Sequence, residues 1–228
     1  MKKKIVKIIM FVFILVFIYS LYNIIIWRNN NKKNEKLKIK TNNILKNDIE
    51  PEKALLSVNP DIVGSISVPD TKIDYIVVKG DNNSYYLKHD LNKDYNNAGW
   101  IFMDYRNKLD GKDKNIIIYG HDTKDESMFG SLKYTLKSSW FDKNKYVYLT
   151  LNDVKYTYEV FSVYETPKEE YYIKTDFNND FKDFVNTLSK RSVHNFNVSV
   201  GENDSILTLS TCSHYGKDRI VLHAKKIW

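Results

Sequence analysis

Hydrophobic and polar positions divide the chain into an apolar segment near the N-terminus and a longer region of short, alternating runs. The apolar segment, IIMFVFILVFIYSLYNIII, covers Ile8–Ile26 and is interrupted only by Ser20 and Asn23. At about 1.5 Å per helical residue it would extend roughly 28 Å, the thickness of a bilayer core. No small-residue cleavage site follows, because the chain continues through IIIWRNN. The pattern therefore predicts an uncleaved transmembrane signal anchor.

Strand-like runs begin near Asn59. They are rich in Val, Ile, Tyr and Thr and are separated by Gly, Asn, Asp or Pro. Eight such runs predict a mainly antiparallel sheet that closes, or nearly closes, into a β-barrel. The runs are VGSISVP, KIDYIVV, GWIFMDY, NIIIYGH, YVYLTL, VKYTYEVFSVYE, SILTLSTC and RIVLHAKKI.

Two segments interrupt the series of strand-like runs. DESMFGSLKYTLKSSWF has a methionine and two leucines at helical spacing, and NNDFKDFVNTLSKRS carries four apolar residues on one helical face. Both predict short amphipathic helices packed on the barrel, the second with Asn178 or Asn179 as its N-cap. The apolar positions are Met128, Leu132 and Leu136 in the first segment, and Phe181, Phe184, Val185 and Leu188 in the second.

These patterns predict four consecutive segments. Residues 1–7 would be a cytoplasmic N-terminal segment, 8–27 the transmembrane anchor, 28–55 an extracellular tether with an N-terminal helix, and 56–228 one folded domain. The polar stretch NNNKKNEKLKIKTNNILKND has no strong period, so it is either a tether or a weak surface helix. With 43% hydrophobic residues in 228, the chain can bury one sizeable core.

Positive charge is confined to the part of the chain beside the predicted anchor. The formal net charge is +7, but residues 1–46 contain eleven Lys and Arg and one Glu, which leaves the rest of the chain at −3. A mildly acidic folded domain argues against nucleic acid as a partner. The lysines after the anchor oppose export under the positive-inside rule, yet the compact Lys2–Lys4 group resembles a signal n-region, and long domains translocate despite their charge. We therefore expect an extracellular domain.

The only cysteine, Cys212, ends the run SILTLSTC. A single thiol outside the cell is inert and buried, paired with another chain, or reactive. Ile206, Thr208, Ser210 and Cys212 share a strand face that becomes more polar toward the thiol. SHYGKD then supplies a turn, and Arg219 begins the returning strand near Cys212. A guanidinium there favours the thiolate and donates to a developing oxyanion, which makes Cys212 a candidate nucleophile.

A thiol nucleophile needs a base, and five histidines compete for the role. His121 is the best placed, because it ends the apolar run NIIIYG, where side chains project beyond a sheet. His214 lies in the predicted turn, His223 lies too far along its strand, and His89 and His194 fall in polar connections. A structural role for a single histidine at a strand end stays open. No cluster of His, Cys or carboxylate residues has metal-ligand spacing, so we predict no metal and no other cofactor.

These motifs together resemble the sortase family, and class B within it. TLSTC followed seven residues later by arginine, with YGH upstream, carries the resemblance. It extends over about residues 56–228 through NPDIVGSISVPDTKIDYIVVKGDNNSYYLKHD, AGWIFMDYRN, NIIIYGHDTKDESMFGSLKY and NNDFKDFVNTLSK. The resemblance implies a sortase-type closed β-barrel of about eight strands with short peripheral helices, preceded by one transmembrane helix.

Carried over position by position, the resemblance makes Cys212 the nucleophile, His121 the acid and base, and Arg219 the residue that holds the substrate and its oxyanion. Three further residues would contact the substrate. They are Ser210, on the face of Cys212, and Tyr172 and Ile173 in EEYYIKTD, for which ordinary packing is an equal alternative.

The implied activity is that of a cysteine transpeptidase. The thiol would attack the carbonyl of a threonine in a C-terminal sorting signal, and an amine of peptidoglycan or lipid II would resolve the thioester. The implied partners are secreted proteins with such a signal, the wall or lipid II amine, and the membrane through the N-terminal helix of a single-pass protein in a Gram-positive bacterium. A pilin-polymerising sortase, a cysteine hydrolase and a non-catalytic anchored binding module remain alternatives.

Overall fold

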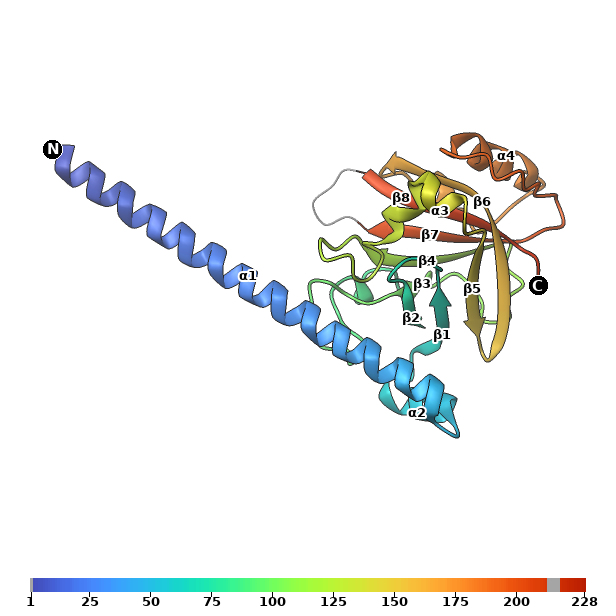
Figure 1. The fold of residues 1–228 in the computed structure, drawn as a ribbon, viewed down its shortest axis with the longest axis horizontal. Helices are drawn as coiled ribbons and strands as arrows, with labels where there is room; N and C mark the ends of the chain where they lie inside the picture. Colours follow the sequence, from blue (N-terminus) through green and yellow to red (C-terminus); the bar gives the residue numbers. More distant parts are fainter. Residues whose placement is uncertain (1, 213–217) are drawn as a thin grey trace.

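The computed structural model describes residues 2–212 and 218–228. Eight strands form a closed barrel in the order β1-β2-β3-β4-β7-β8-β6-β5, which confirms the predicted eight-stranded closure (Figure 1). Six of the eight strand pairs are antiparallel, whereas β2 with β3 and β4 with β7 are parallel. The strands are β1 Ile62–Ser67, β2 Asp74–Val78, β3 Phe102–Met103, β4 Asn115–His121, β5 Tyr146–Leu151, β6 Val154–Pro167, β7 Ile206–Cys212 and β8 Asp218–Lys226.

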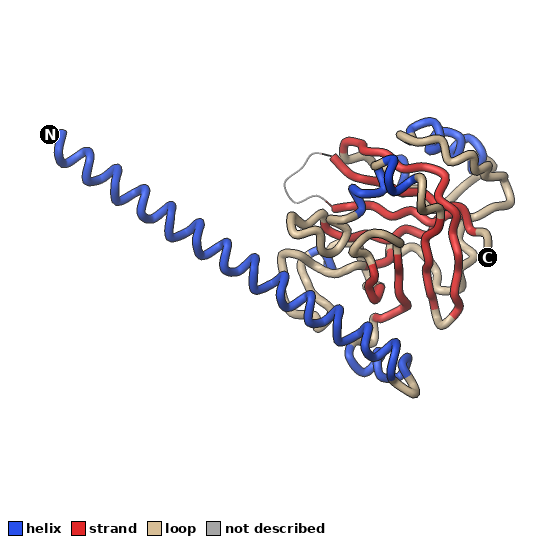
Figure 2. Tube along the Cα trace, viewed as in Figure 1, coloured by secondary structure: helices blue, strands red, loops and turns tan. Residues whose placement is uncertain are grey.

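Helices lie outside the barrel (Figure 2). The α-helices are α1 Lys2–Asn47, α2 Pro51–Val58, α3 Ser138–Phe141 and α4 Phe181–Arg191, and the 3₁₀ helices are η1 Tyr85–Leu87, η2 Leu132–Leu136 and η3 Tyr171–Ile173. Buried side chains form two clusters, one centred on the barrel interior and one between the outer face of β6, β7 and β8 and the η3–α4 layer. The strand face that carries Thr208 and Ser210 is therefore covered by protein, and both side chains are buried.

The amphipathic helix predicted before β7 is α4, and its four apolar residues are all buried as expected. The predicted N-cap was wrong. Asn179 has φ of +62°, a left-handed turn conformation, so the helix starts one residue later with Asp180 at the N-cap. Asn tolerates this conformation better than most residues do, which explains its place in the turn.

The other predicted amphipathic helix is not continuous. Its first predicted apolar position, Met128, has φ of +50° and lies in a tight turn, and only η2 and the four-residue α3 follow. The turn is closed by the Thr123 hydroxyl, which donates to the Ser127 carbonyl at 2.5 Å. A Cβ added to Gly130 would stand 2.3 Å from the Thr123 carbonyl oxygen. The helical spacing of apolar residues thus arises from a compact turn packed on the barrel.

α1 is one continuous helix that carries both the apolar segment and the polar stretch after it. Among the described residues it is the one helix long and apolar enough to cross a membrane, by length and composition. Its C-terminal part lies against the barrel and beside α2 (Figure 1). Asn34, Leu37 and Thr41 are buried there, which makes the polar stretch a docked helix.

Candidate active site

β4 and β7 bring two of the predicted catalytic residues to one rim of the barrel. The strands pair in parallel and in register from Asn115 opposite Ile206 to His121 opposite Cys212. Adjacent strands lie about 4.8 Å apart, and residues paired in parallel register point to the same side. The parallel ladder thus aligns the backbone of Cys212 with His121. The Cys212 side chain and residues 213–217, with His214 among them, lie outside what the structure describes.

Arg219 lies at the same rim, as the second residue of β8. β7 and β8 pair antiparallel up to Ser210 opposite Val221, so Arg219, two residues before Val221, lies at the same end of the two strands as Cys212, two residues after Ser210. On its other side Arg219 is paired with Thr166 of β6. The arginine is half-buried. The structure therefore brings together the three positions that were predicted to carry the chemistry.

The imidazole of His121 is held from η1. The side chain is buried, and its Nε2 lies 2.8 Å from the carbonyl oxygen of Leu87. Because a carbonyl oxygen only accepts, Nε2 is the protonated nitrogen in this bond. Nδ1 is then the nitrogen whose protonation can change while this bond is kept. In catalytic and metal-binding histidines, the hydrogen bond of one ring nitrogen commonly sets the tautomer in this way.

The other described histidines occupy structural positions. His89 is stacked on Tyr85 with ring centroids 4.0 Å apart, and His194 bonds the Leu136 carbonyl at 2.8 Å. His223 is fully buried, and this burial lowers its pKa to about 3, so it is neutral at physiological pH. Among the described residues, no group of three or more His, Cys, Asp or Glu side chains is arranged to hold a metal ion.

The three predicted substrate-contact residues come together on the outer face of β7. The hydroxyls of Tyr172 and Ser210 lie 3.0 Å apart, and both side chains are buried. Ile173 is partly buried and packs against both hydrophobic clusters. η3 is thus seated directly on the strand that ends at Cys212.

A directed chain of hydrogen bonds beneath η3 could not be identified from sequence. The Asn115 carboxamide oxygen only accepts, so Thr208 donates to it at 2.7 Å and accepts from Nδ1 of His223 at 2.9 Å. Nε2 of His223 then accepts from the Tyr164 hydroxyl at 3.0 Å. At the other end, the Asn115 amide donates to two carbonyls of the η3 segment, those of Tyr172 at 3.3 Å and Lys174 at 2.9 Å.

A buried carboxylate holds the same segment from the other side. Asp104 accepts from Nε of Arg106 at 2.8 Å and Nη2 at 2.7 Å, and from the Tyr119 hydroxyl at 2.9 Å. Burial alone would raise the pKa of Asp104, but these bonds outweigh it and hold the pKa below its ordinary value. Nη2 of Arg106 also donates to the Ile173 carbonyl at 2.9 Å. The only sequence signal for this clamp was the spacing of Asp and Arg in MDYRN.

Comparison with known proteins agrees with this geometry. Residues 66–227 match the family profile described as Sortase domain. The chain is 39% identical to sortase B of Listeria monocytogenes over 76% of this chain and 72% of the relative, and 36% identical to sortase B of Staphylococcus aureus over 98% and 96%. It superposes on the crystal structure of sortase B from Bacillus anthracis in complex with AAEK1 with a TM-score of 0.82 and 36% identity, covering 88% of this chain and 99% of that one. The chain therefore belongs to the sortase family, in class B, whose members are cysteine transpeptidases that anchor proteins to the cell wall.

Proposed function

We propose that this enzyme joins secreted proteins to peptidoglycan through a thioester on Cys212. The observation that carries the proposal is the parallel register that sets His121 opposite Cys212, with Arg219 at the same rim. The thiol sulfur attacks the carbonyl carbon of the threonine in the sorting signal, and the thiol proton passes to His121. Arg219 donates to the oxyanion of the tetrahedral intermediate, where charge develops.

Collapse of this intermediate breaks the peptide bond, and the proton held by His121 goes to the leaving amine. In the second half of the reaction an amine of peptidoglycan or lipid II attacks the thioester, gives its proton to His121, and expels the Cys212 sulfur. That sulfur recovers its proton from His121. The enzyme is regenerated, and the product is an amide between the secreted protein and the wall.

We place the groove for the sorting signal against η3. Its wall would be formed by Tyr172 and Ile173, with Ser210 two residues before the nucleophile. Support comes from the bonds that fix this segment, which hold three consecutive carbonyls on side chains of the barrel and its loops. A direct bond from Ser210 to the peptide requires its hydroxyl to share or give up its present bonds, which join it to the Tyr172 hydroxyl at 3.0 Å and the Thr211 carbonyl at 3.4 Å.

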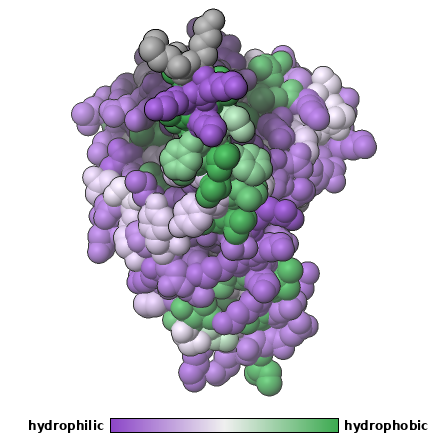
Figure 3. All heavy atoms as spheres, turned by 90° about the vertical axis from the view of Figure 1, so that its left-hand side faces the viewer, coloured by the Kyte–Doolittle hydropathy of each residue, from purple (hydrophilic) through white to green (hydrophobic). Residues whose placement is uncertain are grey.

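We further propose that residues 8–27 anchor the protein in the membrane, with residues 1–7 in the cytoplasm and the catalytic domain outside. β7 ends, and β8 begins, on the side of the barrel from which α1 runs toward its N-terminus (Figure 1). Seen from this side, the apolar side chains of α1 project toward the viewer in front of a largely hydrophilic domain (Figure 3). The reactive rim would therefore face the bilayer, which favours a lipid-linked wall precursor as the source of the amine.

The test is mass spectrometry of the chain after incubation with threonine-containing sorting peptides, with and without a diaminopimelate- or glycine-type amine. We expect a thioester adduct on Cys212 that passes to the amine and is absent in Cys212→Ala. Release of acid regardless of amine would indicate a hydrolase, and transfer only to a pilin lysine a polymerising sortase. Binding without an adduct, unchanged in Cys212→Ala, would indicate a binding module.

A further inference from the structure

The part of α1 that follows the apolar segment contacts the loop between η1 and β3. This loop packs on η1, which holds the imidazole of His121. We propose that Asn34 is a positioning residue for the reaction, and that it acts through Gly99 and the Leu87 carbonyl to orient the imidazole of His121. This inference rests on the proposed role of His121 as acid and base. It makes the membrane-proximal helix a working part of the catalytic domain.

Asn34 is buried against the loop between η1 and β3. The side chain is 1% exposed, its Nδ2 donates to the Gly99 carbonyl at 3.1 Å, and its Oδ1 accepts from Nδ2 of Asn96 at 2.9 Å. The neighbouring Lys33 reaches the same loop, with its Nζ 2.7 Å from Asp90 and 2.6 Å from Asp94. One turn of α1 thus supplies both neutral and charged partners to a single loop.

Gly99 transmits this contact to η1. Its φ of +56° is a left-handed conformation, and a Cβ added to it would lie 2.4 Å from the Tyr86 carbonyl oxygen and 2.9 Å from that of Leu87. The backbone of Gly99 is therefore in close contact with both carbonyls. A hydrogen bond from the Trp100 amide to the Tyr86 carbonyl at 2.9 Å fixes the spacing of loop and η1. A shift of Gly99 would therefore be passed to the Leu87 carbonyl.

The opposite side of η1 is fixed as well. The buried Tyr86 hydroxyl donates to Asp61 at 2.5 Å and accepts from Nδ2 of Asn59 at 3.0 Å. η1 is consequently clamped between this anchor and the loop that Asn34 supports, and its last carbonyl bonds Nε2 of His121.

Removing the Asn34 amide would leave the buried Gly99 carbonyl without this donor, and a buried unsatisfied group is costly. The loop would relax to recover a partner, and the Leu87 carbonyl would move with it. A small rotation of the imidazole then takes Nδ1 away from the reacting atoms, and misplacement by about 1 Å can cost up to about a hundredfold in rate. Substrate binding, which we place at η3, would be little affected, because η3 is held by Asn115 and Arg106 and not by the loop that Asn34 supports.

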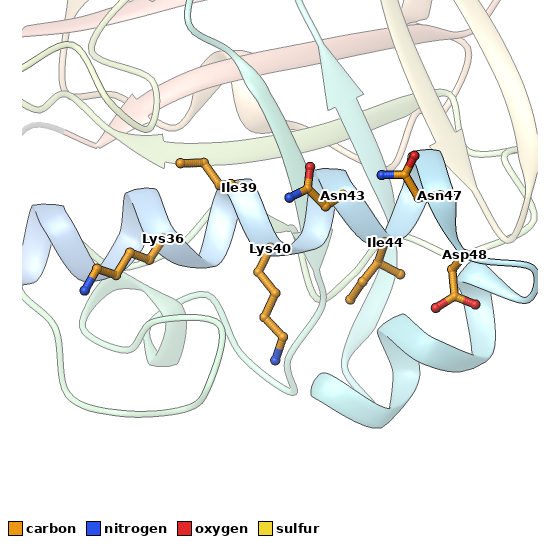
Figure 4. Close-up of a pocket in the computed structure, with 7 residues that line it drawn as sticks. All are labelled: Lys36, Ile39, Lys40, Asn43, Ile44, Asn47 and Asp48. Carbon is orange, nitrogen blue, oxygen red and sulfur yellow. The ribbon is translucent and has the colours of Figure 1, made fainter.

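The experiment compares steady-state kinetics of the full chain in detergent micelles for four single variants and one double variant. Asn34→Ala removes both bonds, and Asn34→Asp keeps the acceptor for Asn96 but removes the donor to Gly99. Gly99→Ala pushes directly on η1. The matched control is Asn43→Ala, an exposed asparagine on the same helix beside a surface hollow, for which no bond to the barrel is found among the described residues (Figure 4).

We expect both Asn34 variants to lower kcat about tenfold with KM for the sorting peptide within twofold, and Asn43→Ala to match the wild type. Asn34 acts on the Leu87 carbonyl only through Gly99. The double variant Asn34→Ala with Gly99→Ala should therefore be no slower than the slower single variant. Nitrogen NMR of the imidazole should show the Nε2-protonated tautomer of His121 in the wild type and a mixture in Asn34→Ala.

Unchanged kcat in folded Asn34 variants, or losses that multiply fully in the double variant, would overturn the proposal. The NMR measurement needs no turnover, so it decides this inference even if the wild type proves inactive with every sorting peptide. In that case the proposed function fails by itself, and an Nε2-protonated His121 that is disturbed only by the Asn34 and Gly99 variants would still support the positioning role.

Discussion

His223 provides a stability test whose size follows from its surroundings. It is fully buried on β8 between the hydroxyls of Tyr164 and Thr208, and its two ring nitrogens serve as one acceptor and one donor. Protonation would give both nitrogens a donor role and would break the bond from Tyr164. It would also place a charge in the second hydrophobic cluster, near Arg191.

The magnitude comes from the difference between the two protonation equilibria. Burial, and to a smaller extent the charge of Arg191, lowers the pKa of His223 to about 3 from 6.5. Because the folded pKa lies below the unfolded one, the stability contributed by neutral His223 is complete above pH 6.5. It is lost as the pH falls toward 3, at about 1.4 kcal/mol per pH unit. At pH 5 the loss from this one site should be ~2 kcal/mol.

The assay is urea unfolding of residues 28–228 at pH 7.5 and pH 5.0, followed by tryptophan fluorescence, for the wild type and His223→Gln. Glutamine offers a donor and an acceptor but does not titrate, so carboxylates that titrate in both proteins cancel in the comparison. We expect the free energy of unfolding of the wild type to fall by ~2 kcal/mol more than that of the variant. An equal fall in both proteins would refute the argument that His223 is held neutral by burial.

Three further substitutions test other parts of the site and barrel. Arg106→Lys should raise KM for the sorting peptide severalfold with a smaller change in kcat, because a point charge cannot bind both the buried carboxylate and the Ile173 carbonyl; an unchanged KM would separate this clamp from substrate binding. Gly64→Ala places a methyl group 1.8 Å from the Thr150 carbonyl oxygen of β5 and should lower the free energy of unfolding, measured by thermal unfolding, by ~3 kcal/mol. Gly201→Ala, whose methyl group would lie 3.5 Å from the Asp204 carboxylate, should change it little. Arg219→Lys should lower kcat at least tenfold by loss of forked donation, as measured by transpeptidation; near-normal rates would leave Arg219 a structural role.

Much of the fold was readable because the relevant signals are local. Short runs rich in Val, Ile, Tyr and Thr marked all eight strands, and the apolar helical face marked α4, since each signal arises from residues within one element. The same logic failed at Met128, where helical spacing came from a packed turn with a left-handed residue. A spacing pattern records which residues are buried and not the backbone path that buries them.

The candidate catalytic positions were recognisable from residue types at strand ends, together with a family resemblance. What the sequence by itself determined was the eight strands and α4, the membrane-length apolar segment and the three residues Cys212, His121 and Arg219 as candidates for the chemistry. Their placement at one rim needed a further fact, the parallel register of β4 and β7.

Only the tertiary structure decided which distant polar residues meet. Asn115 and Thr208 are 93 positions apart, and Asn34 and Gly99 are 65 apart, yet each pair is joined by a hydrogen bond in a buried site. Neither pairing leaves a trace in local periodicity, because an isolated Asn or Thr reads the same whether it is solvated or buried with a partner. Closure of the barrel on its apolar faces also buries polar groups, and each enclosed polar group needs a partner that no local pattern can name.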